Sequence, residues 1–399
     1  MPGVTSEITA VLDHLVSVFS HGEGFSECAQ RLAQRGSVSM DGVNGAARAL
    51  AIASLGRSCQ GTVVAIVESR AELDAICDEL SLFYPGVIDR LPAWESDPDE
   101  TTLFDEVYGD RLRTLNRLVR RPQEVKLLVA SIQSFLQPLP HQSTFAQSTR
   151  ELTVGDDLEM ATFVEWLVKH GYQNSIAVEL PGEFAHRGGI VDVFPPDRSH
   201  PIRLELFGDE LESLRSFEPE TQRSIASLTS VEITVLQRPR EGQTMQLTEF
   251  LPTDSWILLH DFPRLQTAAE NFLAHRETQM TVEQLWQSVQ RFGWGEIAPV
   301  VLGGNDFSWR VPVDSVERFS GEVGRVTHEL EQIAGDDRVH IVVENKAETK
   351  RLRELFDGSE VGARLNYIEG RIGAGFRLTD DKTLVLSGLF CPSQAKSIG

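Results

Sequence analysis

Two strand-like segments, each next to a glycine turn, constrain the fold more than any other part of this chain. Residues 183–196 read Glu-Phe-Ala-His-Arg-Gly-Gly-Ile-Val-Asp-Val-Phe-Pro-Pro, and residues 202–210 read Ile-Arg-Leu-Glu-Leu-Phe-Gly-Asp-Glu. Glycine adopts positive φ at little cost, whereas β-branched and aromatic residues favour extended backbone. The pattern therefore predicts a small sheet whose strands are joined by tight turns.

Alternation along the second segment predicts which of its side chains are exposed. Side chains at i, i+2 and i+4 of a strand share one face, so Arg203, Glu205 and Phe207 lie together, and the intervening leucines point into a core. Arg187 lies at the neighbouring turn. A face carrying Arg, Glu and Phe is typical of a docking surface. A solvated sheet face with one aromatic residue is the alternative that spacing alone leaves open.

Composition excludes several classes of protein. The 399 residues predict two to four domains, and a net charge of −22 argues against a general nucleic-acid-binding surface. The four cysteines, Cys28, Cys59, Cys77 and Cys391, lack ligand spacing, so no metal site is expected. Because no basic-apolar leader and no run of 18 apolar residues is present, we expect a cytoplasmic protein without a membrane span.

Strands alternate with helices in the first 150 residues. Apolar spacing predicts helices at 7–20 and 71–83, and short apolar runs predict strands at 62–67, 87–91 and 126–130. This alternation is typical of a doubly wound α/β domain with a buried parallel sheet.

A glycine-rich turn at 42–49 invites comparison with the phosphate loop Gly-x-x-x-x-Gly-Lys-[Ser/Thr]. The turn keeps Gly42 and has Gly45, but Ala47 replaces the second glycine, Arg48 the lysine and Ala49 the metal-binding hydroxyl. Ala47 adds a Cβ where backbone must wrap phosphate, and Ala49 offers no oxygen to magnesium. We expect no nucleotide hydrolysis and no cofactor here; an ordinary turn before a helix is the simpler interpretation.

Three segments together resemble a known family. They are Leu-Pro-Ala-Trp-Glu at 91–95, Arg-Leu-Arg-Thr-Leu at 111–115 and the Gly-Glu-Phe-x-x-Arg-Gly-Gly segment at 182–196. The chain resembles the N-terminal region of the bacterial transcription-repair coupling factors (Mfd), a region shared with the excision-repair protein UvrB. The resemblance is specific over about residues 40–235 and weaker towards the end. The phosphate loop is intact in UvrB and degenerate in Mfd, so 42–49 matches Mfd. Residues 129–140 also leave no room for the DNA-clamping hairpin of UvrB.

The resemblance implies an α/β multidomain protein that is not an enzyme by itself. It implies a degenerate helicase-like α/β domain with an inserted small α+β docking domain and a C-terminal small α/β domain. The corresponding ranges are 1–148 for the first part of the helicase-like domain, 149–236 for the docking domain, 237–304 for the return segment and 305–399 for the last domain.

The resemblance also implies a partner and its contact residues. The family's docking domain recruits UvrA in transcription-coupled nucleotide-excision repair, and its contact residues fall on Arg187, Arg203 and Phe207. The alternative is a residual ATP- and DNA-binding helicase-like protein. A local DNA-binding patch would then be expected on one helix that carries Arg111, Arg113, Arg117, Arg120 and Arg121. A solvated helix face that docks on neighbouring domains is the simpler account of these arginines.

Complete family members are ATP-dependent DNA translocases with further domains. Those domains bind RNA polymerase and DNA, so we expect this chain to lack both partners, because its residues resemble only the preceding region. In the family a C-terminal region masks the UvrA-binding surface. The resemblance therefore predicts constitutive UvrA binding by this chain, without a nucleotide requirement.

Overall fold

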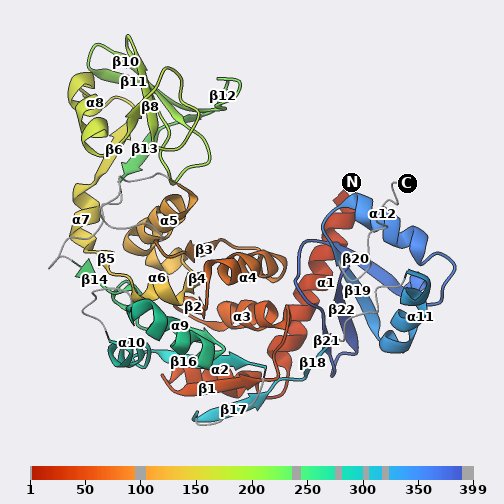
Figure 1. Ribbon diagram of the computed structural model, residues 1–399. Helices are drawn as coiled ribbons and strands as arrows, with labels where there is room; N and C mark the ends of the chain where they lie inside the picture. Colours follow the sequence, from red (N-terminus) through yellow and green to blue (C-terminus); the bar gives the residue numbers. More distant parts are fainter. Residues whose placement is uncertain are drawn as a thin grey trace. The chain divides into compact units, whose positions relative to one another are not determined.

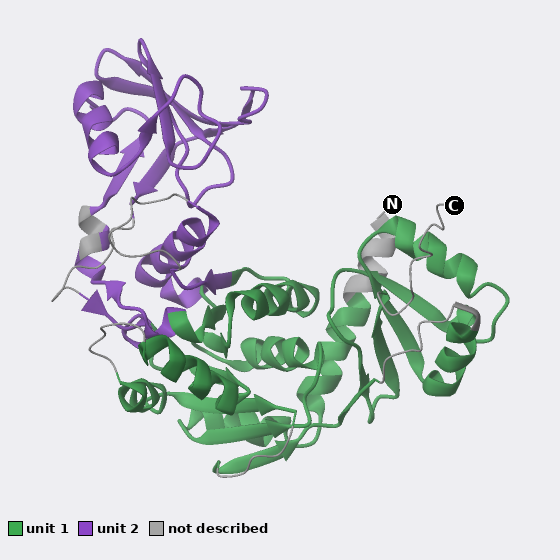
Figure 2. Ribbon diagram, viewed as in Figure 1, with its two compact units in different colours: residues 1–88, 125–133, 251–399 green, residues 89–124, 134–250 purple. Residues whose placement is uncertain are grey.

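The computed structural model describes residues 2–94, 105–235, 244–274, 281–299, 305–316 and 323–388. The chain divides into two compact units, each assembled from separated segments (Figure 2). Unit 1 contains 1–88, 125–133 and 251–399, and unit 2 contains 89–124 and 134–250. Residues 238–243, whose sequence Arg-Pro-Arg-Glu-Gly-Gln is typical of a linker, lie outside the described residues.

Unit 1 is built on a parallel sheet, as the alternation of strands and helices predicted (Figure 1). Its strand order is β17-β1-β16-β15-β2-β4, followed by β3 as the last strand. The boundary between the two units falls within β3. The core strands are almost continuously apolar and buried, which is typical of parallel sheets covered on both faces. The strands are β1 (Ser37–Asp41), β2 (Val63–Val67), β3 (Ile88–Leu91), β4 (Leu127–Ser131), β15 (Trp256–His260), β16 (Gly293–Ala298) and β17 (Phe307–Arg310).

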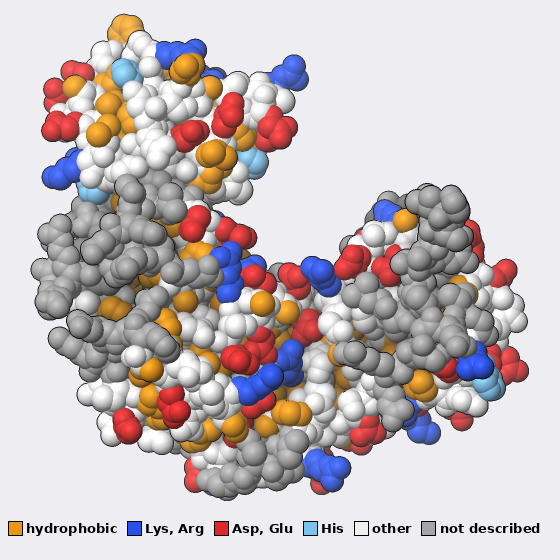
Figure 3. All heavy atoms as spheres, in the orientation of Figure 1, with side chains coloured by type: hydrophobic (Ala, Val, Ile, Leu, Met, Phe, Trp, Pro, Cys, Tyr) orange, Lys and Arg blue, Asp and Glu red, His pale blue; other side chains and the backbone are white. Residues whose placement is uncertain are grey.

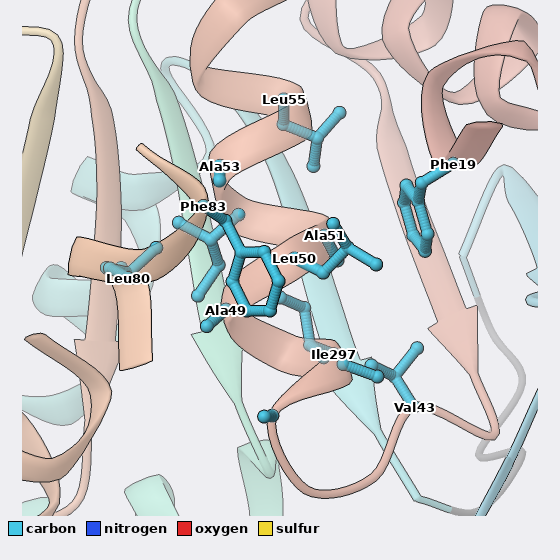
Figure 4. Packing of buried hydrophobic residues seen from close by; sticks show 14 of the residues in the cluster. Phe19, Val43, Ala49, Leu50, Ala51, Ala53, Leu55, Leu80, Phe83 and Ile297 are labelled. Atoms are coloured by element: carbon cyan, nitrogen blue, oxygen red, sulfur yellow. The ribbon is translucent and has the colours of Figure 1, made fainter. Parts of the chain in front are cut away.

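The helix after the glycine-rich turn, α3 (Ala47–Ser58), lies at the centre of the main core. Its residues are buried almost all round, and Figure 4 shows Ala49, Leu50 and Phe83 within one apolar cluster. The side chain of Ser69 caps the neighbouring helix by accepting a hydrogen bond from the backbone N–H of Glu72. The unit's other helices around this sheet are α1 (Pro2–His21), α2 (Phe25–Ala33), α4 (Arg70–Phe83), α9 (Phe262–Ala274) and α10 (Val282–Val289).

A second, five-stranded sheet follows in unit 1 and shares the main core. Ile372 and Phe376 belong to the same buried cluster as Leu50 and Phe83. β17, which the sequence assigned to the last domain, pairs in parallel with β1 of the large sheet. The strand order is β18-β21-β22-β19-β20, with β18 (Val313–Ser315), β19 (Arg338–Val343), β20 (Leu365–Glu369), β21 (Phe376–Leu378) and β22 (Thr383–Ser387). The helices here are α11 (Val323–Ala334), α12 (Lys346–Leu355) and the 3-10 turn η3 (Gly362–Arg364).

Unit 2 carries the predicted α+β layer, a six-stranded sheet of order β12-β11-β10-β9-β8-β7 (Figure 1). One face of this sheet, including Leu204 and Leu206, packs against Phe163 and Leu167 of helix α8 (Met160–Lys169). The strands are β7 (Gln173–Asn174), β8 (Glu183–Arg187), β9 (Ile190–Val193), β10 (Ile202–Phe207), β11 (Glu210–Phe217) and β12 (Ser224–Leu228). β6 (Thr149–Thr153) pairs separately with β13 (Ser230–Thr234), and β5 (Leu139–Pro140) pairs with β14 (Thr244–Met245).

Their place in the sequence makes Asp156 or Asp157 a candidate N-cap for α8, but neither residue caps it. The residue before the helix is Glu159, which makes no capping hydrogen bond with its side chain. Asp156 instead accepts a hydrogen bond from the backbone N–H of Thr153 through Oδ2, and Asp157 pairs with Glu210 in an isolated bridge. A local turn therefore uses the carboxylate that was expected at the helix.

The tryptophan segment and the arginine-rich helix α5 (Glu106–Arg120) serve the packing of unit 2. The amide of Gln137 bonds both backbone groups of Trp94, accepting at 2.8 Å and donating at 2.9 Å. Buried Arg111 stacks over the Trp94 ring at 4.8 Å and donates to the carbonyl of Pro92. The remaining short helices are η1 (Pro122–Glu124), α6 (Ile132–Leu136), α7 (Gln142–Gln147) and η2 (Leu247–Glu249).

The two faces of β10 should respond oppositely to truncation. We expect Leu204→Ala to lower the free energy of unfolding by about 2–5 kcal/mol, because Leu204 is fully buried and its loss leaves a cavity. Phe207→Ala, three residues along the same strand but exposed, should change it by less than about 0.5 kcal/mol. Urea unfolding of both variants measures this, and equal losses would contradict the assigned faces.

Candidate functional site

The outward face of the sheet in unit 2 includes the tips of two neighbouring hairpins, β8–β9 and β10–β11. The backbone N–H of Leu206 donates to the carbonyl of Gly189 at 2.7 Å and so joins the β8–β9 tip to β10. Strand register places Ile190 opposite both Arg187 and Glu205. Gly208 turns the second hairpin with φ +65°, the conformation predicted for a glycine there. We call this outward surface the docking face; it consists of Arg187, Ile190, Asp192, Arg203, Glu205, Phe207 and Arg215.

An apolar surface lies exposed at these tips. Phe207 is 80% exposed, as the alternation predicted, and Ile190 on the same face is 37% exposed. Arg187 is exposed, and its Nη2 donates to the carbonyl of Ile176, a residue that is itself 85% exposed. Sequence reasoning identified Phe207 and missed both isoleucines. Ile190 could have been identified by pairing the two strands in register, because Ile190 then lies opposite Glu205.

Arg203 is already engaged within the domain. Its Nε and Nη2 donate to the two carboxylate oxygens of Asp192 at 2.7 and 2.8 Å, and Nη2 also donates to Gln222 at 3.1 Å. The guanidinium lies over the ring of buried Phe217, 4.6 Å from its centroid. The hydrogen bond to Asp192 raises the pKa of Arg203 above its usual value, so its charge is fixed.

A second cross-strand ion pair neutralises the next position along the docking face. Glu205 pairs with Arg215 of β11 and accepts a hydrogen bond from the hydroxyl of Ser213 at 2.7 Å. The hydrogen bond from Arg215 lowers the pKa of Glu205. The docking face therefore combines two internally balanced ion pairs with an exposed aromatic ring, which favours a partner surface with a matching apolar centre.

The glycine-rich turn in unit 1 has most of its backbone donors occupied. Gly42 and Val43 donate to the carbonyl of Ala298, and Ala46 donates to the carbonyl of Ala374, at 3.0, 3.2 and 3.2 Å respectively. Gly45 has φ +54°, and a Cβ there would lie 2.9 Å from the same Ala374 oxygen. The loop between β20 and β21 therefore occupies the position over the turn, where a phosphate loop would leave its N–H groups open.

Ala47 and Ala49, at two of the positions that differ from the phosphate-loop pattern, pack in the core, and Arg48 at the third takes part in an ion-pair network. Ala47 and Ala49 are fully buried in the apolar cluster of α3. Arg48 donates to Glu72 at 2.8 Å and approaches Nε2 of His260 at 2.9 Å. His260 Nδ1 lies 2.6 Å from Glu72, so a proton on Nδ1 bonds Glu72 and leaves Nε2 to accept from Arg48.

The pKa values of two glutamates in this network are shifted in opposite directions. Burial disfavours ionised Glu72, but its hydrogen bond with His260, together with Arg48, lowers the pKa of Glu72 to about 2. Glu79 lies deeper, and burial raises its pKa although Gly373 donates to it at 3.0 Å and Arg48 is 4.0 Å away. Glu72 is therefore the carboxylate that neutralises Arg48.

The arginines of α5 do not form an open basic patch. Arg113 pairs with Asp110, Arg117 with Asp89 at 3.1 Å, and Arg120 with Glu232. On the face drawn in Figure 3, the coloured basic side chains are interspersed with acidic ones. This arrangement agrees with the interpretation of α5 as a helix that docks on its neighbours.

The described residues contain neither a metal-binding cluster nor a membrane-spanning helix. No group of three or more histidine, cysteine or acidic side chains could hold a metal ion there. Within the same part of the chain, no helix is long and apolar enough to cross a membrane.

Comparison with known proteins assigns the sheet that bears the docking face. The family model described as "UvrB interaction domain" matches residues 151–237. This segment is therefore similar to UvrB interaction domains. Its described part holds Arg187, Arg203 and Phe207, all three residues that the sequence resemblance had selected.

The chain is also similar, over about half of its length, to proteins named transcription-repair-coupling factor. The one from Myxococcus xanthus is 31% identical over 224 residues, which are 53% of this chain and 18% of that protein. Those from Bacillus subtilis (strain 168) and Mycobacterium tuberculosis (strain CDC 1551 / Oshkosh) are 32% and 35% identical over 48% and 46% of this chain. The matches span 16% and 15% of those two proteins, so the similarity covers less than a fifth of each relative. The resemblance to this family is confirmed.

The Glu72 network should make stability depend on pH in a defined window. The folded pKa of about 2 lies below the ordinary 4.5, so Glu72 stabilises the fold above about pH 4.5 and loses this effect as pH falls towards 2. We expect Glu72→Gln to cost roughly 2 kcal/mol at neutral pH and progressively less below pH 4.5.

Urea unfolding from about pH 6 to about pH 3 measures the effect. Glu354→Gln is the control, because it removes a carboxylate from an exposed helical pair with Lys350. A difference between wild type and Glu72→Gln that stays constant over this range would contradict the assignment.

Proposed function

We propose that this chain recruits UvrA through the docking face of its UvrB interaction domain, in transcription-coupled nucleotide-excision repair. The observation that carries the proposal is the exposure of Phe207 beside Arg187 and Arg203, within a region matched by that family model. Exposed aromatic and arginine anchors are the residues that most often dominate binding energy at protein interfaces. The similarity to transcription-repair-coupling factors supports the same role.

We further propose that recruitment requires no nucleotide hydrolysis by this chain. Three contacts support this: Ala374 covers the turn, Arg48 is committed to Glu72, and Ala49 is packed in the core. A nucleotide would have to displace the β20–β21 loop and break the Arg48 network before its phosphates reached the backbone.

Isothermal titration of UvrA with this chain tests the recruitment. Wild type should bind, and Phe207→Ala should lose about 2 kcal/mol or more of binding free energy while keeping its fold. Ile225→Ala is a matched control, since Ile225 is also an exposed apolar residue but lies on the edge strand β12. Wild-type affinity in folded Phe207→Ala would contradict the proposal.

Restoring the phosphate-loop residues tests the nucleotide proposal. The triple variant Ala47→Gly, Arg48→Lys, Ala49→Thr should still fail to bind ATP, because the Ala374 carbonyl remains over the turn. It should also be destabilised by roughly 2 kcal/mol or more, since it loses the Arg48 network and places a hydroxyl in the apolar core.

Fluorescence titration with an ATP analogue and thermal unfolding measure both effects. ATP binding by wild type or by the triple variant would contradict the proposal, and so would undiminished stability of the triple variant. A UvrA titration that gave heat only when this chain had first been loaded with ATP would contradict it as well.

A further inference from the structure

Arg203 presents only one edge of its guanidinium to a partner. The pair with Asp192 uses Nε and one N–H of Nη2, and Gln222 accepts from Nη2 as well. Among the described residues, Nη1 has no acceptor. The side chain as a whole is 22% exposed, although Asp192 and Gln222 bond its other edge.

Two further contacts fix the plane of the guanidinium. The ring of Phe217 supports it from below at 4.6 Å, and Phe217 is itself fully buried with Val178, Ala185 and Phe194. Gln222 is held in a turn with φ +58°, where its backbone N–H donates to Glu218 and its Nε2 donates to Pro219. A charged group fixed in this way loses little conformational entropy when it binds a partner.

We propose that Asp192 is a positioning residue for partner binding, holding Arg203 so that Nη1 donates end-on to one acceptor oxygen of UvrA. This inference rests on the proposed function. The end-on hydrogen bond takes the place of the side-on bidentate pair that arginine commonly makes with a partner carboxylate, because Asp192 already occupies that side of the guanidinium. Arg187 and Phe207 keep their places as direct contacts.

An alternative role for Asp192, as a substitute for a partner carboxylate, predicts the opposite change in binding affinity. If Asp192 only substituted for a partner carboxylate in the free chain, its removal would release the bidentate edge and strengthen binding. If it positions Arg203, removal lets the guanidinium rotate off the Phe217 ring and weakens binding. The sign of the change in affinity therefore separates the two.

A double-mutant cycle measured by titration with UvrA tests the inference. Asp192→Asn should bind about tenfold more weakly than wild type, and in an Arg203→Gln background the same change should alter affinity less than about twofold. Gln222→Ala, which removes only the second acceptor, should show a smaller loss of the same kind. Unchanged or stronger binding by Asp192→Asn would overturn the inference.

A spectroscopic measurement distinguishes loss of Arg203 positioning from general destabilisation of the domain. In ¹⁵N spectra, the Arg203 Nε–H of wild type should be protected from solvent exchange, and Asp192→Asn should lose that protection. Glu232→Gln is the control, because it removes a carboxylate from an arginine pair elsewhere in unit 2, with Arg120, and should change neither affinity nor the Arg203 signal.

Failure of the inference is distinguishable from failure of the proposed function. If wild type binds UvrA and Phe207→Ala and Arg203→Gln are defective, but Asp192→Asn binds normally, only the positioning role is wrong. If wild type does not bind UvrA at all, the proposed function is wrong and the inference is wrong with it.

Discussion

The two-residue period of strand β10 is the constraint on which the docking face depends. Leu204 and Leu206 are buried against helix α8, and this burial fixes the register, because a slip by one residue would expose both leucines and bury Arg203 and Phe207. The same burial therefore stabilises the sheet and exposes the docking face. Under the proposed function, partner binding and stability depend on opposite faces of one strand, so each can be changed separately.

Charge on the docking face is organised by cross-strand pairs. Asp192 and Arg203 on neighbouring strands form one pair, and Glu205 and Arg215 form the next. Such pairs leave little net charge to attract a partner over distance, so an exposed aromatic ring with fixed hydrogen-bond donors is what the face offers. This surface is compatible with a strongly acidic chain, whose overall charge of −22 would oppose acidic partners.

The turn before α3 combines positive φ at two glycines with backbone donors that already have acceptors. Gly42 and Gly45 both have positive φ, yet the donors at the turn bond Ala298 and Ala374. Arg48 is held by Glu72 and His260, residues far apart in the sequence. Neutral carbonyl oxygens therefore accept from backbone donors near this helix N-terminus, where an anion could otherwise bind.

The sequence by itself determined the features that depend on local pattern. Alternation gave the exposed Phe207 and the buried leucines, and apolar runs gave strands such as β2 and β15, because periodicity is a property of neighbouring residues. Only the tertiary structure decided which groups at long separation meet. The sequence identified Arg203 but not its pair with Asp192, and it found the altered turn but not the Ala374 carbonyl over it. The prediction that Asp156 or Asp157 caps α8 was wrong for the same reason, since a polar side chain bonds whichever backbone donor the fold brings nearest.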